Sequence, residues 1–192
     1  AVISADNVGS LSEVGTIQVG EAGETANAVA FSPDSTVVAV AHGNNVTLTT
    51  LSDNNFRILR GHEGKVNALA YSPDGTRLVT ASADRTLKVW DVSNGAAVLT
   101  ITNPDNNEFR TVAFSPNGEQ IGASSSFLNS YVISAESGDI LMTFEPLVTT
   151  TVQAIAFTPD NSSLWVATGD AIIRQWDIAT GNELRQISVS DS

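Results

Sequence analysis

The sequence predicts an all-β protein built from four tandem repeats, each containing four antiparallel strands. An apolar segment ending in a turn occurs four times along the 192 residues, and its aromatic residues are Phe31, Tyr71, Phe114 and Phe157. These aromatic residues are spaced 40, 43 and 43 positions apart. No window shows a sustained apolar period of 3.6 residues, so helix is expected to be nearly absent.

Each copy of the segment ends in the same chemistry, which is Ser or Thr, then Pro, then Asp or Asn. Proline and a short polar side chain stop a strand and form a turn. The copies occupy residues 28–34, 68–74, 111–117 and 154–160. A period of about 40–45 residues with this chemistry is typical of β-propeller blades. We therefore expect one unit over residues 1–192, with blades at about 20–60, 61–102, 103–146 and 147–190.

The second copy shows the plan of a repeat most clearly. Its strands are expected at residues 66–71, 78–82, 86–92 and 97–101. Its first two strands carry apolar residues on both faces, which is expected for a sheet covered on both sides. A further strand candidate, residues 14–19, precedes the first blade and brings the expected number of strands to seventeen.

The second copy also carries motifs at characteristic places. Gly61-His62 precedes its first strand, Ser72-Pro73-Asp74-Gly75 follows that strand, and Trp90-Asp91 ends the third strand. Over its whole length this copy resembles a WD40 repeat. The resemblance implies a buried hydrogen-bonded network made of His62, Thr80 or Ser82, Asp84 and Trp90.

The other copies depart from this pattern. The fourth keeps Thr168, Asp170 and Trp176 but has Val148 at the histidine position, and the third has Phe127 in place of the turn aspartate. The complete network is thus expected in the second blade alone, and the first and third blades are expected to be held by apolar packing. Residues 3–17 look like the lead-in of some bacterial WD40 domains, which makes residue 1 look like a true beginning.

The number of strands bears on ring closure. Four blades need sixteen strands, and strands of the outer type are expected at both ends, residues 14–19 and 183–189. Propellers as small as four blades exist, but WD40 propellers usually have about seven. We therefore expect an open segment of a larger propeller, or a ring completed by other copies of the chain, and not an isolated closed monomer.

Composition limits the classes of partner. The net charge is −12, from 21 acidic and 9 basic residues, and the basic residues are dispersed. Because a phosphate-binding face needs clustered Lys and Arg, nucleic acid is not expected as a partner. The longest apolar run, residues 37–41, is far shorter than the roughly 18 residues of a membrane helix, so membrane insertion is not expected. There are no cysteines. The compartment is undecided, with a secreted or cell-surface location preferred to the cytoplasm.

No catalytic, cofactor-binding or metal-binding residue is predicted, and no cofactor is expected. His42 has no ligand partner at metal-binding spacing, so it is expected to be a surface or turn residue. The oxygen-rich loops 53–55 and 105–108 lack the spacing of a calcium loop. Trp165 lies outside the expected network and is interpreted either as an interface anchor or, preferably, as ordinary packing between blades.

These observations favour a non-catalytic scaffold for protein interaction or assembly, with protein partners or self-association. Two alternatives stay open from the sequence. One is a secreted or surface structural subunit that polymerises. The other is the binding portion of a larger sensor or enzyme.

Overall fold

The structure, a computed structural model, describes residues 25–126, 129–145 and 151–188. Its described residues form sixteen strands and no helix. The strands are β1 (Ala26–Phe31), β2 (Val37–His42), β3 (Asn45–Thr50), β4 (Phe56–Leu59), β5 (Val66–Tyr71), β6 (Arg77–Ser82), β7 (Thr86–Asp91), β8 (Ala97–Thr102), β9 (Phe109–Phe114), β10 (Gln120–Ser125), β11 (Ser130–Ser134), β12 (Ile140–Phe144), β13 (Val152–Phe157), β14 (Ser163–Thr168), β15 (Ile172–Asp177) and β16 (Glu183–Ser188). The predicted strand at residues 14–19 lies outside the described residues.

The strands form four separate antiparallel sheets of four, each a meander in which consecutive strands pair. We call them blades 1 to 4: β1–β4, β5–β8, β9–β12 and β13–β16. The predicted all-β fold with four-stranded blades is thereby confirmed. The strands expected in the second repeat agree with β5–β8 to within one residue at each end.

The turn after the first strand of each blade explains why the repeat is so regular. In blade 2 the Ser72 hydroxyl donates to the Asp74 carboxylate at 2.6 Å and accepts the Arg77 N–H at 2.9 Å. Gly75 follows with a φ of +71°, a conformation that favours glycine. The equivalent side chains in the other blades, Ser32, Ser115 and Thr158, make the same pair of contacts.

The hydrophobic core lies between the blades and not inside a single sheet. Three clusters of buried side chains fill the seams between blades 1 and 2, 2 and 3, and 3 and 4. In each seam the first strand of the following blade lies against the first two strands of the preceding blade. At the first seam, for example, Leu69 and Tyr71 of β5 belong to the same cluster as Ala28 and Ala30 of β1.

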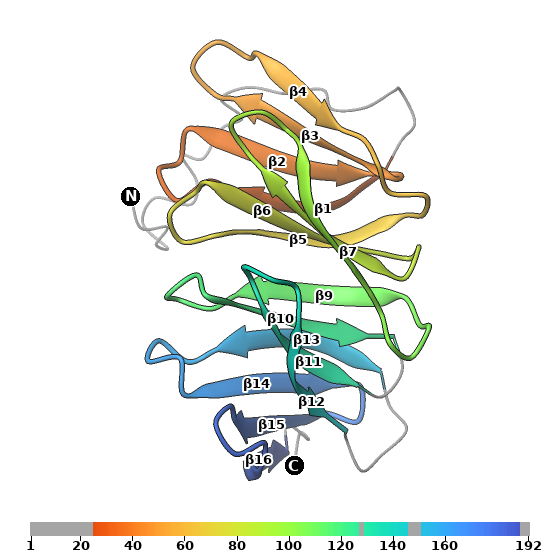
Figure 1. Ribbon diagram of the computed structural model, residues 1–192, viewed down its shortest axis with the longest axis vertical. Coiled ribbons are helices and arrows are strands. Elements are labelled where there is room, and N and C mark those ends of the chain that lie inside the picture. The colour runs from red at the N-terminus through yellow and green to blue at the C-terminus, as the bar shows by residue number, and fades with distance from the viewer. Residues whose placement is uncertain (1–24, 127–128, 146–150, 189–192) are drawn as a thin grey trace, which may run out of the picture.

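The blades are stacked in chain order along the long axis of the molecule (Figure 1), so blade 1 and blade 4 lie at opposite ends. The described residues thus form an open array and not a closed four-blade ring. Among the described residues, each end blade packs against only one neighbouring blade.

Candidate functional site

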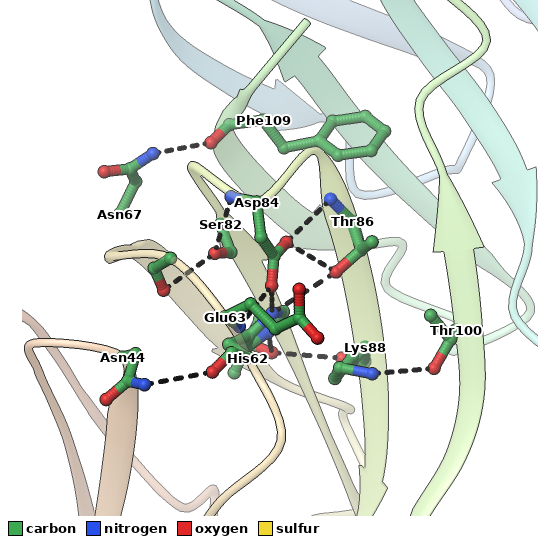
Figure 2. Close-up of polar contacts among 12 residues, drawn as sticks. Asn44, His62, Glu63, Asn67, Ser82, Asp84, Thr86, Lys88, Thr100 and Phe109 are labelled. Carbon is green, nitrogen blue, oxygen red and sulfur yellow. Dashed lines mark hydrogen bonds and ion pairs between the residues drawn. The ribbon is translucent and has the colours of Figure 1, made fainter. Parts of the chain in front are cut away.

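The polar network of blade 2 is built by the segment before β5 and by strands β6 and β7 (Figure 2). His62 is buried, and its Nδ1 lies 2.7 Å from a carboxylate oxygen of Asp84 while its Nε2 lies 2.7 Å from Oγ1 of Thr80. The indole N–H of Trp90 donates to the same Thr80 oxygen at 2.9 Å. Because a carboxylate only accepts, Nδ1 carries the proton and Nε2 accepts from the Thr80 hydroxyl.

Of the two hydroxyl candidates, the structure therefore places Thr80 between His62 and Trp90. Ser82 lies at the end of β6 and has a different set of partners. Its hydroxyl donates to the carbonyl of Gly64 at 3.0 Å and accepts the N–H of Asp84 at 3.1 Å. Ser82 thus holds the turn that carries the aspartate, while Thr80 joins the two rings.

The protonation states of the pair follow from burial and hydrogen bonding. Burial lowers the pKa of His62 below 6.5, and the hydrogen bond to Asp84 only partly offsets this effect. Burial alone would raise the pKa of Asp84, but hydrogen bonds from Thr86, the Glu63 N–H and His62 outweigh it and lower the pKa to about 2. At neutral pH the network therefore contains a neutral imidazole and a charged carboxylate, an arrangement that orients side chains.

The face of blade 4 that points away from blade 3 is the second feature of the site. Strand register assigns its residues to positions that are buried in blade 2: Trp165 corresponds to Val79, since each pairs with an alanine of the first strand. Ile187 likewise corresponds to Ile101. Ile101 is 7% exposed because blade 3 covers it, whereas Ile187 is 43% exposed.

Trp165 lies on this open face, half-buried, and the guanidinium of Arg185 stacks over its ring at 4.8 Å from the centroid. The Nε of Arg185 also donates to the side-chain oxygen of Gln175 at 3.0 Å, and the Gln175 amide donates to Ser163 at 3.0 Å. A cation stacked on tryptophan is favourable by about 0.5–1 kcal/mol at exposed sites. This face therefore combines a half-buried aromatic ring with a fixed positive charge.

Parts of the chain are similar in sequence to known proteins. The family described as WD domain, G-beta repeat, matches residues 53–91, which include β5–β7 and the network. Protein pleiotropic regulator PRL2 of Arabidopsis thaliana is 48% identical over 48 residues, 25% of this chain and 10% of the relative. Periodic tryptophan protein 2 of Saccharomyces cerevisiae is 54% identical over 41 residues, 21% of this chain and 4% of the relative. WD repeat-containing protein 1 of Bos taurus is 31% identical over 93 residues, 46% of this chain and 15% of the relative.

The chain therefore carries a WD40 repeat at residues 53–91. It spans a tenth, about a twenty-fifth and about a seventh of the lengths of these three relatives. WD40-repeat proteins are in general non-catalytic scaffolds for protein interaction.

Blade 4 departs from the WD40 network in a way that the sequence did not predict. Thr168 and Asp170 are in contact, with the Thr168 hydroxyl donating to the carboxylate at 2.5 Å. A buried arginine, Arg174, which corresponds in strand register to Lys88 of blade 2, donates to Thr168 at 2.7 Å and to Asp170 at 3.2 Å. Trp176 instead packs against Phe144 at 5.3 Å between ring centroids. The Val148 position lies outside the described residues.

The family pattern predicts a histidine as the partner of the turn aspartate, so it does not indicate Arg174. One signal could have found it. Asp170 stands at a turn with no histidine before the blade, and Arg174 is four positions later in a strand that alternates toward the interior. A turn carboxylate without a histidine donor indicates that a cation on the adjoining strand is its partner.

Blade 3 also holds a polar network, so the expectation that apolar packing alone holds blades 1 and 3 is wrong. The buried Tyr131 of β11 donates its hydroxyl to the carboxylate of Asp105, which also accepts from the Asn129 amide at 2.6 Å. Burial, together with the neighbouring carboxylate, raises the pKa of Tyr131. The tyrosine stays protonated and acts as a donor. The Phe127 position lies outside the described residues.

In blade 1, His42 is buried at the end of β2, with Nε2 2.7 Å from Oγ1 of Thr47. The prediction of a surface or turn histidine is therefore wrong. His42 is the last residue of β2, and the strand places its ring in the interior. All four blades thus contain a buried polar contact near the ends of their second and third strands, with different residues in each.

The described residues hold no group of three or more His, Asp or Glu side chains arranged to bind a metal ion. They also contain no helix long and apolar enough to cross a membrane.

Proposed function

We propose that this chain is a non-catalytic scaffold for protein interaction or assembly, and that its interaction surface is the open face of blade 4. One observation carries the proposal: positions that are buried at an internal seam are left uncovered at the end of the array. Ile101 and Ile187 give the clearest comparison, at 7% and 43% exposed.

The first strand of blade 4 supports the same proposal. Ala68 and Ala70 of β5 pack into the seam with blade 3, while Ala154 and Ala156 at the same positions of β13 are exposed. Small side chains here leave room for the larger side chains of a covering element. Trp165 adds an aromatic anchor of the kind found at binding hot spots.

An open array also has a physical reason to associate. Uncovered apolar faces and unpaired strand edges are sites where other chains dock. We propose that the array is completed either within a larger propeller or by other copies, and that nucleic acid and membrane are not its partners. The comparisons give no support to a secreted polymer-forming subunit or to the binding portion of a sensor or enzyme.

The test is the molar mass of the chain by size-exclusion chromatography with light scattering over a range of concentrations. We expect the mass to rise above 20.1 kDa with concentration. Ala156→Glu, which buries a charge in the proposed contact, is expected to lower the association, whereas Ala96→Glu, at an exposed alanine just before β8 of blade 2, is the matched control. A constant mass of 20.1 kDa for all three proteins would overturn the proposal.

A further inference from the structure

Arginines cross two of the three seams between blades. At the first seam, Arg57 of β4 donates to the carbonyl oxygens of Val92 at 3.1 Å and Ser93 at 2.7 Å in blade 2. At the second seam, Arg77 of β6 donates to the carbonyl of Ala135 at 2.7 Å in blade 3. A guanidinium with several fixed donors suits such a contact with backbone carbonyls.

The acceptors at the two seams occupy the same place in their blades. Val92 follows the last residue of β7, and Ala135 follows the last residue of β11. The N–H of Val92 bonds the carbonyl of Thr76 at 3.0 Å, and the N–H of Ala135 bonds that of Glu119 at 2.9 Å. The backbone is therefore fixed in the same way, with a carbonyl offered to the preceding blade.

Arg185 occupies in blade 4 the position that Arg57 occupies in blade 1. Arg57 pairs with Leu48 of the third strand, and Arg185 pairs with Gln175 at the equivalent register. The two contacts that hold its guanidinium, with Trp165 and Gln175, lie within blade 4. Arg185 is thus fixed on the open face, in the position from which Arg57 reaches the next blade.

Blade 1 offers the complementary surface. Val29 and Phe31 of β1 are 62% and 59% exposed, although Leu69 and Tyr71 at the same positions of β5 pack on the preceding blade. Val38 on the same face is already buried, so the first strand is the part that remains available. This is the strand that forms the internal seams.

The turn after the third strand of blade 1 has the same backbone hydrogen bond as the turns that accept from the seam arginines. Leu51 follows the last residue of β3, and its N–H bonds the carbonyl of Thr36 at 2.9 Å, as Val92 does with Thr76. The carbonyls of Leu51 and Ser52 are therefore the counterparts of the acceptors of Arg57.

We propose that blade 4 of one copy receives blade 1 of a second copy head to tail, with Arg185 donating to the carbonyls of Leu51 and Ser52. The occupant is a second copy because this chain presents both halves of a seam that it already forms three times. Two such contacts close a ring of two copies, and an unclosed series gives a filament. The inference rests on the proposed scaffold function and names its partner.

Cysteine cross-linking tests the geometry, because the chain contains no cysteine. In the internal seams a Cβ on Gly75 would lie 3.3 Å from Pro33, and one on Gly118 would lie 3.4 Å from Pro73. The corresponding pair across the proposed contact is Pro159 of one copy and Ser35 of the other.

We expect a mixture of Pro159→Cys and Ser35→Cys chains to form a covalent dimer under mild oxidation. Each variant alone, and a mixture of Pro159→Cys with Ser137→Cys in blade 3, is expected to stay uncross-linked. If Pro159→Cys cross-links with itself, or with Ser137→Cys as readily as with Ser35→Cys, the head-to-tail contact is wrong.

The role of Arg185 is tested by the dissociation constant of the complex measured by sedimentation. Hydrogen bonds to charged groups are strong enough that Arg185→Gln should weaken association about tenfold or more, while Arg110→Gln is the exposed control. An equal effect of the two variants would overturn the role of Arg185.

If the chain associates and Ala156→Glu prevents this, yet the cysteine pair does not react, the seam is wrong and the scaffold proposal stands. If the chain does not associate at all, both are wrong.

Discussion

The indole N–H of Trp90 donates to Oγ1 of Thr80 at 2.9 Å, and the same oxygen contacts the buried imidazole of His62. One threonine hydroxyl thus joins two aromatic rings from different parts of blade 2. We expect Trp90→Phe to destabilise the chain by about 1–3 kcal/mol, because it leaves a buried hydrogen-bonding group without its donor.

Trp165→Phe is the matched comparison for this substitution. Trp165 is half-buried on the open face, and its described contact is with Arg185 rather than with a buried acceptor. Urea denaturation of the two variants should give the lower midpoint for Trp90→Phe. Equal urea midpoints for the two variants would show that the network does not stabilise the fold.

The pH dependence of stability follows from the two pKa shifts in this network. The pKa of His62 is below 6.5 in the folded chain, so its contribution is fully present above pH 6.5 and is lost as the pH falls below that value. The pKa of Asp84 is lowered from 3.8 to about 2, so its contribution is present above pH 3.8 and is lost between about 3.8 and 2. Between pH 7.5 and 5, therefore, His62 is the member of the pair that responds.

Comparison of the free energy of unfolding of wild type and His62→Asn at pH 7.5 and 5 isolates this effect from the change in net charge. We expect the difference between the two proteins to be larger at pH 7.5. A difference that does not change with pH would show that His62 does not titrate as the structure requires.

Arg174 should be a larger contributor to stability than any exposed arginine. It is buried in β15 and donates to Thr168 and Asp170. Arg174→Ala removes both charge-assisted hydrogen bonds and should cost about 1–3 kcal/mol in the free energy of unfolding. The control is Arg110→Ala, and similar denaturation midpoints for the two variants would contradict the assignment.

Calcium and chelators are expected to leave the melting temperature unchanged. Asp105, in the more oxygen-rich of the two loops, is already engaged by Tyr131 and Asn129. Differential scanning calorimetry with and without calcium checks this. A reproducible rise of several degrees would disagree with it and would point first to residues 105–108.

The strands could be predicted from the sequence because their ends are marked by local chemistry. Ser72-Pro73-Asp74-Gly75 stops β5 with contacts between residues a few positions apart, and such contacts are visible in the order of the residues. The residues of the polar network in blade 2 could be predicted from the same regularity, since Gly61-His62 and Trp90-Asp91 stand at fixed places relative to these turns.

The networks of the other blades could not be predicted in this way. Arg174, Tyr131 and His42 each find partners that depend on how neighbouring strands align across the sheet, with a different choice in each blade. The open array was expected, but the exposure of individual residues on the open face of blade 4 could not be read from the sequence pattern. Ile187 and Ile101 occupy equivalent places in the repeat, and only the presence or absence of a neighbouring blade distinguishes them.

The four stacked blades form an open array, and we propose that its end faces bind other chains. Sedimentation velocity of the unmodified chain over a wide concentration range tests it most directly. We expect a concentration-dependent sedimentation coefficient and species larger than 20.1 kDa. A single compact species of 20.1 kDa at every concentration would contradict the claim and would favour a self-closed ring of four blades.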